Sequence, residues 1–113
     1  MTKAKSDKIV RWFKANVSLC DWDIEVGDAI SIGGEFLGAQ TTNLMLRSAA
    51  IMIVPDAHKG GEGEMGDEEH TLLHELVHCF FDECDVKGEG ERFEFCVDRL
   101  ARMLLRQYRS DNA

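Results

Sequence analysis

The segment His74-Glu75-Leu76-Val77-His78 decides how the rest of this sequence is interpreted. Residues at positions i and i+4 project from the same side of an α-helix, so the two imidazoles can bind one tetrahedral zinc ion. Glu75 lies beside them and can take a proton from a zinc-bound water. Zinc lowers the pKa of that water toward neutrality and polarises a carbonyl under attack. We therefore predict a Zn²⁺ site with His74 and His78 as ligands and Glu75 as general base.

The residues around this segment favour one helix over its whole length. Asp67, Glu68 and Glu69 suit a first helical turn, because the helix dipole attracts negative charge there. In helical projection a buried apolar stripe runs beside the motif and consists of Leu73, Leu76, Val77, Phe80 and Phe81. The motif also arises by chance at ordinary residue usage, and the alternative is an amphipathic helix with two flanking histidines. The apolar stripe favours a metal site at the edge of a core.

Zinc needs a third protein ligand, and no histidine follows His78. The candidates are a downstream carboxylate, His58 or His70. His70 precedes His74 by one turn on the same face, and three ligands in line on a straight helix cannot easily surround a metal. We therefore expect His70 to lie at the surface or beside a ligand. His58 falls in a glycine-rich segment, residues 56–66, and is interpreted as an ordinary loop histidine.

Among the carboxylates, Glu94 falls on the margin of the apolar stripe of the last helix, where a buried charge needs a partner. Glu91 falls further toward solvent and is kept as the alternative. Asp98 is one turn beyond Glu94 and can accept a hydrogen bond from the free ring nitrogen of a zinc-bound histidine. The competing interpretation for both carboxylates is salt bridging to Arg99, Arg102 or a lysine. We predict Glu94 as third ligand, supported by Asp98.

The remaining sequence predicts one α+β domain over residues 1–113. The expected elements are a helix at 4–18, strands at 22–26, 40–47 and 49–54, a flexible loop at 56–66, and helices at 67–82 and 91–108. The strands are expected to form a small two- to three-stranded antiparallel sheet. The expected buried face of the last helix consists of Phe93, Val97, Leu100, Ala101 and Leu104.

The net charge of −8 repels phosphate backbones and disfavours nucleic-acid binding as the main role. Positive charge clusters near both ends of the chain, which we interpret as two solvated helix faces. The sequence contains no apolar run long enough to span a membrane and no signal-peptide pattern, so a cytoplasmic protein is expected.

The four cysteines lack C-x-x-C spacing, so a zinc ribbon or thioredoxin-like motif is not indicated. In the cytoplasm they are expected to be reduced. Cys79 and Cys96 fall in apolar helical patterns and are expected in the core, whereas the pattern around Cys84 does not place it.

Two family resemblances follow from these segments. His74–His78 followed by Glu94-x-x-x-Asp98 resembles the layout of thermolysin-like gluzincins, with a shorter gap than is usual there. That resemblance implies that Glu94 binds zinc and that Asp98 orients His74. Residues 70–78 and 94–101 are more similar to the active helix and the downstream E-x-x-A-N-x-F-A segment of small ImmA/IrrE-type metallopeptidases of bacteria and phages.

The second resemblance covers roughly two-thirds of the chain and extends to an early strand at 22–26. Asp98 stands where that group usually has asparagine, and Val97 where it has alanine. The resemblance implies a minimal zincin fold and a regulatory protein such as a repressor as substrate. The small size and single domain look like those of a phage or prophage protein.

The leading hypothesis is therefore a zinc metallopeptidase acting on a peptide or protein, with the strand before the active helix available to pair with the substrate. The alternative is a non-catalytic, zinc-containing binding module that retains the fold. Glu75 opposes that alternative, since a structural zinc site has no need of a general base. A nucleic-acid regulator is a third, weaker hypothesis. The residue that stabilises the transition state is left open among His58, His70 and Tyr108.

Overall fold

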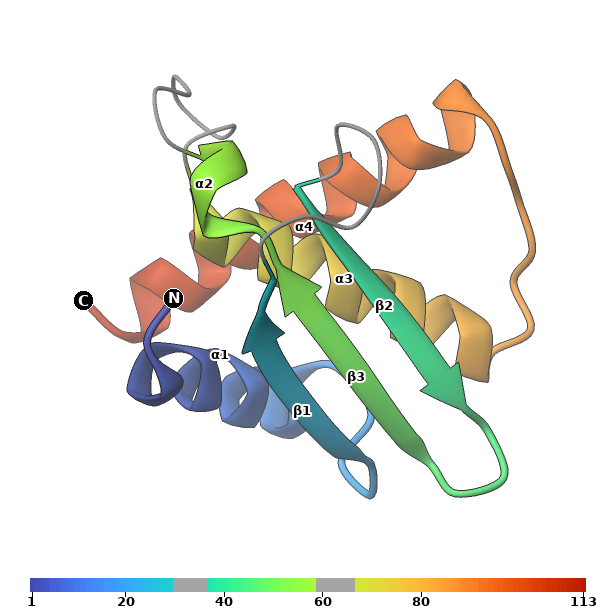
Figure 1. Cartoon of the computed structure of the whole chain (residues 1–113), viewed down its shortest axis with the longest axis horizontal. Coiled ribbons are helices and arrows are strands. Elements are labelled where there is room, and N and C mark those ends of the chain that lie inside the picture. Colours follow the sequence, from blue (N-terminus) through green and yellow to red (C-terminus); the bar gives the residue numbers. More distant parts are fainter. Residues whose placement is uncertain (30–36, 59–66) are drawn as a thin grey trace.

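The computed structural model describes residues 1–29, 37–58 and 67–113, and these residues form the predicted α+β arrangement. Figure 1 shows the elements, which are α1 (Lys3–Asn16), β1 (Asp23–Asp28), β2 (Gly38–Asn43), β3 (Ser48–Ile53), α2 (Pro55–His58), α3 (Glu68–Glu83) and α4 (Glu91–Asp111). Within these three ranges, no helix has the length and apolar character needed to cross a membrane.

The sheet is mixed, so the expectation of an antiparallel sheet is wrong for one of its two pairings. The strand order is β1-β3-β2, with β2 antiparallel to β3 and β1 parallel to it. After β1 the chain forms the far edge strand, β2, and then returns through a hairpin into the central position. The two strands with the clearest sequence patterns, β1 and β3, therefore run in the same direction.

The second strand also lies earlier than its expected range of residues 40–47. It covers Gly38–Asn43, and the next residues form the tip of the β2–β3 hairpin. Three apolar residues at this tip, Leu44, Met45 and Leu46, suggested a longer strand. They are exposed to solvent in the structure, and Met45 is 95% exposed. Hydrophobicity alone therefore placed the strand end too late.

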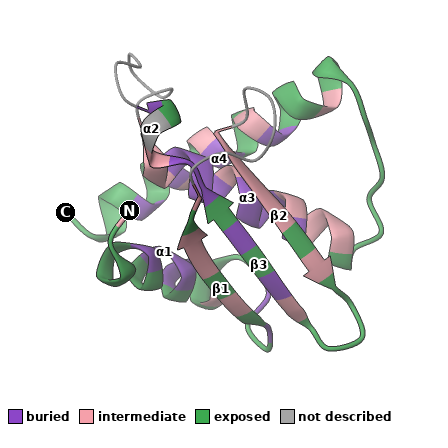
Figure 2. Cartoon of the chain, viewed as in Figure 1, coloured by how far each residue is buried: buried purple, intermediate pink, exposed green. Residues whose placement is uncertain are grey.

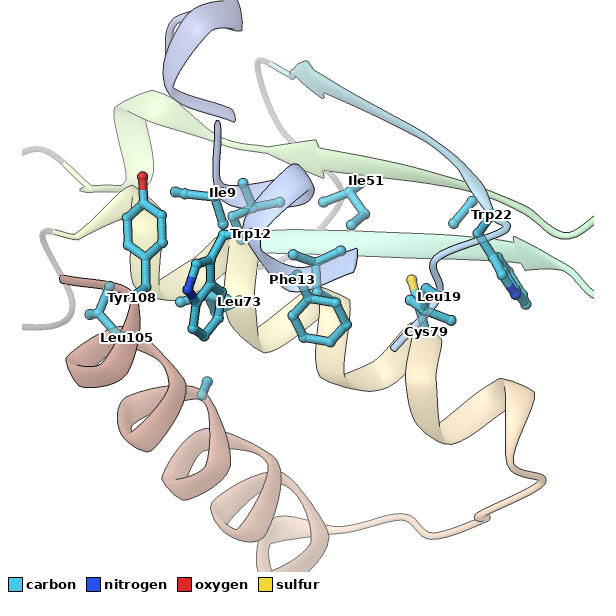
Figure 3. Packing of buried hydrophobic residues seen from close by; sticks show 14 of the residues in the cluster. Ile9, Trp12, Phe13, Leu19, Trp22, Ile51, Leu73, Cys79, Leu105 and Tyr108 are labelled. Atoms are coloured by element: carbon cyan, nitrogen blue, oxygen red, sulfur yellow. The ribbon is translucent and has the colours of Figure 1, made fainter. Parts of the chain in front are cut away.

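Helix α3 is the centre of the molecule, since it lies between the sheet and α4 while α1 packs against β1 and α3 (Figures 1 and 3). Burial is concentrated on α3 and on the inward-facing residues of β3, as Figure 2 shows. The aromatic rings of Trp12 and Tyr108 meet edge to face with centroids 5.6 Å apart, and Trp12 Nε1 donates to Asp111 Oδ2 at 2.8 Å. These contacts fix the end of α4 against α1.

The buried face of α4 is turned toward Leu105 and Tyr108 relative to the predicted face, because α4 is an outer layer that packs on α3. Its buried residues are Val97, Ala101, Leu105 and Tyr108. Leu100 is 38% exposed and Cys96 is exposed, so the predictions that they lie in the core are wrong. The core position of Cys79 is confirmed, and Cys84 is exposed.

Candidate metal centre

Helices α3 and α4 form an antiparallel hairpin that supplies all the candidate ligands. At one end, the Asp67 side chain caps α3 by accepting from the backbone N–H groups of Glu69 and His70. Arg109, near the end of α4, donates to Asp67 and, at 3.0 Å, to Glu69 Oε1. A capping carboxylate satisfies N–H groups that the helix itself leaves unpaired. This end of the hairpin is therefore held by charge and capping together.

Near the other end of the hairpin, the three predicted ligands come together. Nε2 of His74 lies 3.0 Å from Glu94 Oε2, and Nε2 of His78 lies 3.2 Å from Glu94 Oε1. One ligand atom from each residue can be chosen so that all lie within 4.8 Å of one another. At zinc–ligand distances near 2 Å, the corners of a tetrahedron are about 3.3 Å apart. The spacing and donor types of these three side chains therefore fit Zn²⁺.

Glu75 faces the same space from the buried side of α3. Glu75 is only 7% exposed. Burial, and to a smaller extent the charge of Glu94, raises the pKa of Glu75 to about 7. Burial, together with the neighbouring His78, lowers the pKa of His74, which favours the neutral imidazole that binds metals. A carboxyl group that titrates near neutrality can both accept and return a proton at working pH.

Asp98 contacts two histidines and an arginine. Its Oδ1 atom lies 3.1 Å from His70 Nε2 and 3.6 Å from His74 Nδ1, and its Oδ2 atom lies 3.3 Å from Arg102 Nη2. The His74 distance exceeds a normal hydrogen bond, whereas the His70 distance does not. Asp98 is thus closer to His70 than to the histidine that the sequence paired with it.

These side chains line one pocket of about 450 Å³, and its other wall is formed by the start of the edge strand β2 and the residue before it. The wall residues are Leu37, Gly38, Ala39 and Gln40. A Cβ atom at Gly38 would lie 2.8 Å from Thr71 Cγ2 and 3.0 Å from the Met52 carbonyl oxygen. Glycine therefore allows β2 to approach α3 closely. This wall was not predicted from the sequence. Gly38 was the one residue whose type could have indicated a close approach of two elements.

His58 is not a loop residue as expected, because residues 55–58 form α2; the rest of the predicted loop, 59–66, lies outside the described residues. The His58 ring is buried, with Nδ1 2.7 Å from the Val54 carbonyl oxygen and Nε2 2.8 Å from Thr71 Oγ1. With Nδ1–H donating to Val54, the Thr71 hydroxyl donates to Nε2. Both His58 nitrogens are therefore engaged beside the pocket rather than in it.

His70 is the remaining histidine of the pocket. It is 6% exposed, and its Nε2 atom, although near Asp98, makes no hydrogen bond of acceptable angle with the described part of the chain. A buried polar atom without such a partner is unusual in proteins. His70 thus lines the pocket with its buried Nε2 atom beside the Asp98 carboxylate and without a well-aligned hydrogen bond.

Comparison of this chain with protein-family models, with curated proteins and with solved structures gave no match. We therefore infer function from the side chains that meet in this pocket.

Proposed function

We propose that this protein is a zinc-dependent metallopeptidase. The observation that carries the proposal is Glu75, a carboxyl with a pKa of about 7, beside a cluster of two imidazoles and one carboxylate. Three protein ligands leave a fourth position open, which is the arrangement of catalytic rather than structural zinc sites. A site that only stabilised the fold would gain nothing from a nearly buried Glu75.

The roles of the chain's own residues follow from their positions. His74, His78 and Glu94 would hold the zinc, which when bound lowers the pKa of water and polarises the scissile carbonyl. Glu75 would take the proton of the attacking water and return it to the leaving amine. Its pKa near neutrality suits both steps.

Among the three residues considered for transition-state stabilisation, the geometry favours His70. Tyr108 packs on Trp12, and both nitrogens of His58 are already engaged. His70 lines the pocket with Nε2 unengaged by any well-aligned hydrogen bond. We assign it the role of hydrogen-bonding the substrate oxygen on which negative charge develops.

The edge strand β2 supports an extended peptide as substrate. The strand directly before α3 was the expected pairing partner, but β3 is central and is paired on both sides. Among the strands of the described ranges, one side of β2 is unpaired, and residues 37–40 line the pocket. A peptide can add to such an edge through backbone hydrogen bonds. A regulatory protein as substrate completes the proposal and rests on the ImmA/IrrE resemblance. The proposed phage origin rests on the small size and single domain, and the proposed cytoplasmic location on the sequence pattern of the chain.

The second candidate is the non-catalytic zinc-containing module. It is separated from a peptidase by comparing wild type with Glu75→Gln for zinc content and for cleavage of a mixed peptide library. The peptidase proposal expects about one zinc per chain in both proteins and cleavage by wild type alone. Zinc without cleavage by either would favour the binding module, and wild type that takes up no zinc would overturn both.

A further inference from the structure

The side of α4 opposite its buried residues carries both arginines and large apolar side chains. We call this side the outer face of α4; it consists of Arg92, Phe95, Cys96, Arg99, Met103 and Arg106. These positions follow the helical repeat and lie away from the buried Val97, Ala101 and Leu105. The outer face was interpreted from sequence as a solvated charged surface, but its apolar members do not fit that description.

Phe95 and Met103 are each 61% exposed, although both side chains would gain free energy from burial. The Arg99 guanidinium carbon lies 5.7 Å from the centre of the Phe95 ring, so the arginine stacks on the aromatic group. Phe95 and Met103 are eight residues apart, about 12 Å along the helix axis, and Arg99 lies between them on the same face. Aromatic residues, methionine and arginine are the types enriched at protein–protein interfaces.

The three arginines of the outer face are not neutralised by the chain itself. In the described structure none of Arg92, Arg99 and Arg106 forms an ion pair, whereas Arg109 on the same helix binds Asp67 and Glu69. The carboxylates of Glu94 and Asp98 are directed to the histidines of the metal centre. A chain of net charge −8 thus presents one face where positive charge is unopposed.

We propose that the outer face of α4 docks an acidic amphipathic helix of a partner protein. The arginines recur every seven residues, a spacing of about 10.5 Å along the helix axis. A partner helix with carboxylates at the same interval would meet all three, and its apolar residues would cover Phe95 and Met103. This inference does not depend on the proposed peptidase activity.

Other occupants fit less well. Antiparallel pairing with a second copy of α4 about Arg99 would set Arg92 against the second copy's Arg106, and like charges repel. A nucleic acid carries a negative charge on every nucleotide, so the net charge of −8 opposes it more strongly than a helix with a few carboxylates. The exposed positive residues of α1, Lys5, Lys8 and Arg11, have no exposed large apolar residue among them and serve as a natural comparison.

The test uses a fluorescent synthetic helical peptide with glutamates seven residues apart and leucines between them, measured by anisotropy at physiological salt. We expect saturable binding to the full-length protein. The triple variant Arg92→Glu/Arg99→Glu/Arg106→Glu should lower affinity at least tenfold, and Phe95→Ser/Met103→Ser should also weaken it. The matched variant Lys5→Glu/Lys8→Glu/Arg11→Glu changes the net charge equally and should bind like wild type. Circular dichroism checks that each variant is folded.

Three results would overturn the proposal. Absence of binding to wild type is one. Equal loss in both triple variants is the second, because it would reduce the effect to overall charge. The third is preferential binding of a single-stranded oligonucleotide through the same arginines, which would make the face a nucleic-acid site.

Discussion

Nε2 of His70 lies 3.1 Å from Oδ1 of Asp98, and this pair forms one end of the row of polar groups in the pocket. Asp98 is itself placed by Arg102, whose Nη2 atom is 3.3 Å from Oδ2. The carboxylate therefore lies against His70 from α4 without a well-aligned hydrogen bond to it, and His70 lines the pocket next to the candidate ligands. The relationship gives His70 a role that differs from those of His74 and His78.

If His70 binds the substrate oxygen, His70→Ala should leave zinc content unchanged and lower kcat by about 10²-fold, as loss of a transition-state hydrogen bond does. The change in KM should be smaller, because the contact strengthens as charge develops. Asp98→Asn should lie between wild type and His70→Ala. Zinc loss in His70→Ala would instead make His70 a ligand, and an unchanged kcat would remove it from the reaction.

Glu94 and Glu91 provide a matched pair for the third ligand. Both are glutamates in the first turn of α4, but only Glu94 reaches the two histidines. We expect Glu94→Ala to weaken zinc affinity by well over ~10-fold, since even neighbours of ligands contribute about that much. Glu91→Ala should bind zinc like wild type in a competition titration with a chelating dye. The opposite ranking would exchange their roles.

Glu75 should make the stability of the metal-free protein depend on pH. Its pKa rises from 4.5 to about 7 on folding, so the folded state holds the proton more tightly. Stability is therefore greatest below pH 4.5 for this group, falls as pH rises toward 7, and is constant above that. The loss is on the order of 3 kcal/mol for such a shift.

Glu75→Gln removes this titration. Urea unfolding of the metal-free proteins should show the variant gaining stability over wild type as pH rises from 4.5 to about 7. Other titrating groups are common to both proteins and cancel in the difference. A difference that stays constant over this range would mean that Glu75 titrates normally in the folded protein.

Gly38 and Gly27 test the close approach of β2 to α3. A Cβ atom at Gly38 would meet Thr71 at 2.8 Å and the Met52 carbonyl at 3.0 Å, whereas at Gly27 the nearest atom is the Met52 sulfur at 3.6 Å. Gly38→Ala should therefore destabilise the protein by about 1–3 kcal/mol, as overpacking does. Gly27→Ala should cost much less in the same thermal or urea measurement. Equal effects would mean that β2 can shift away from α3 freely.

The helices could be predicted from sequence because their information is local. The periodicity around residues 74–78 and 94–101 located α3 and α4 and selected the residues that meet in the cluster. The burial of Leu100 could not be predicted correctly, because the side of a helix that becomes buried depends on which element packs against it. The Asp98–His70 contact depends on the distance and crossing of two helices, which no periodicity encodes.

The sheet shows the limit of local patterns more clearly. The strands at 23–28 and 48–53 were readable, but their parallel pairing depends on the chain forming β2 at the far edge first. The pocket wall at residues 37–40 was missed for the same reason, since only tertiary contact brings it to α3.

All three candidate ligands come from a single helical hairpin, whereas the facing wall of the pocket comes from a strand more than thirty residues earlier in the chain. The ligands of the candidate metal centre and the facing wall of the pocket are thus encoded by separate segments of the sequence. Substitutions at residues 37–40 can alter the shape of the space beside the ligands without touching an imidazole or Glu94. The fold therefore permits the choice of bound molecule to diverge while the ion-holding unit stays the same.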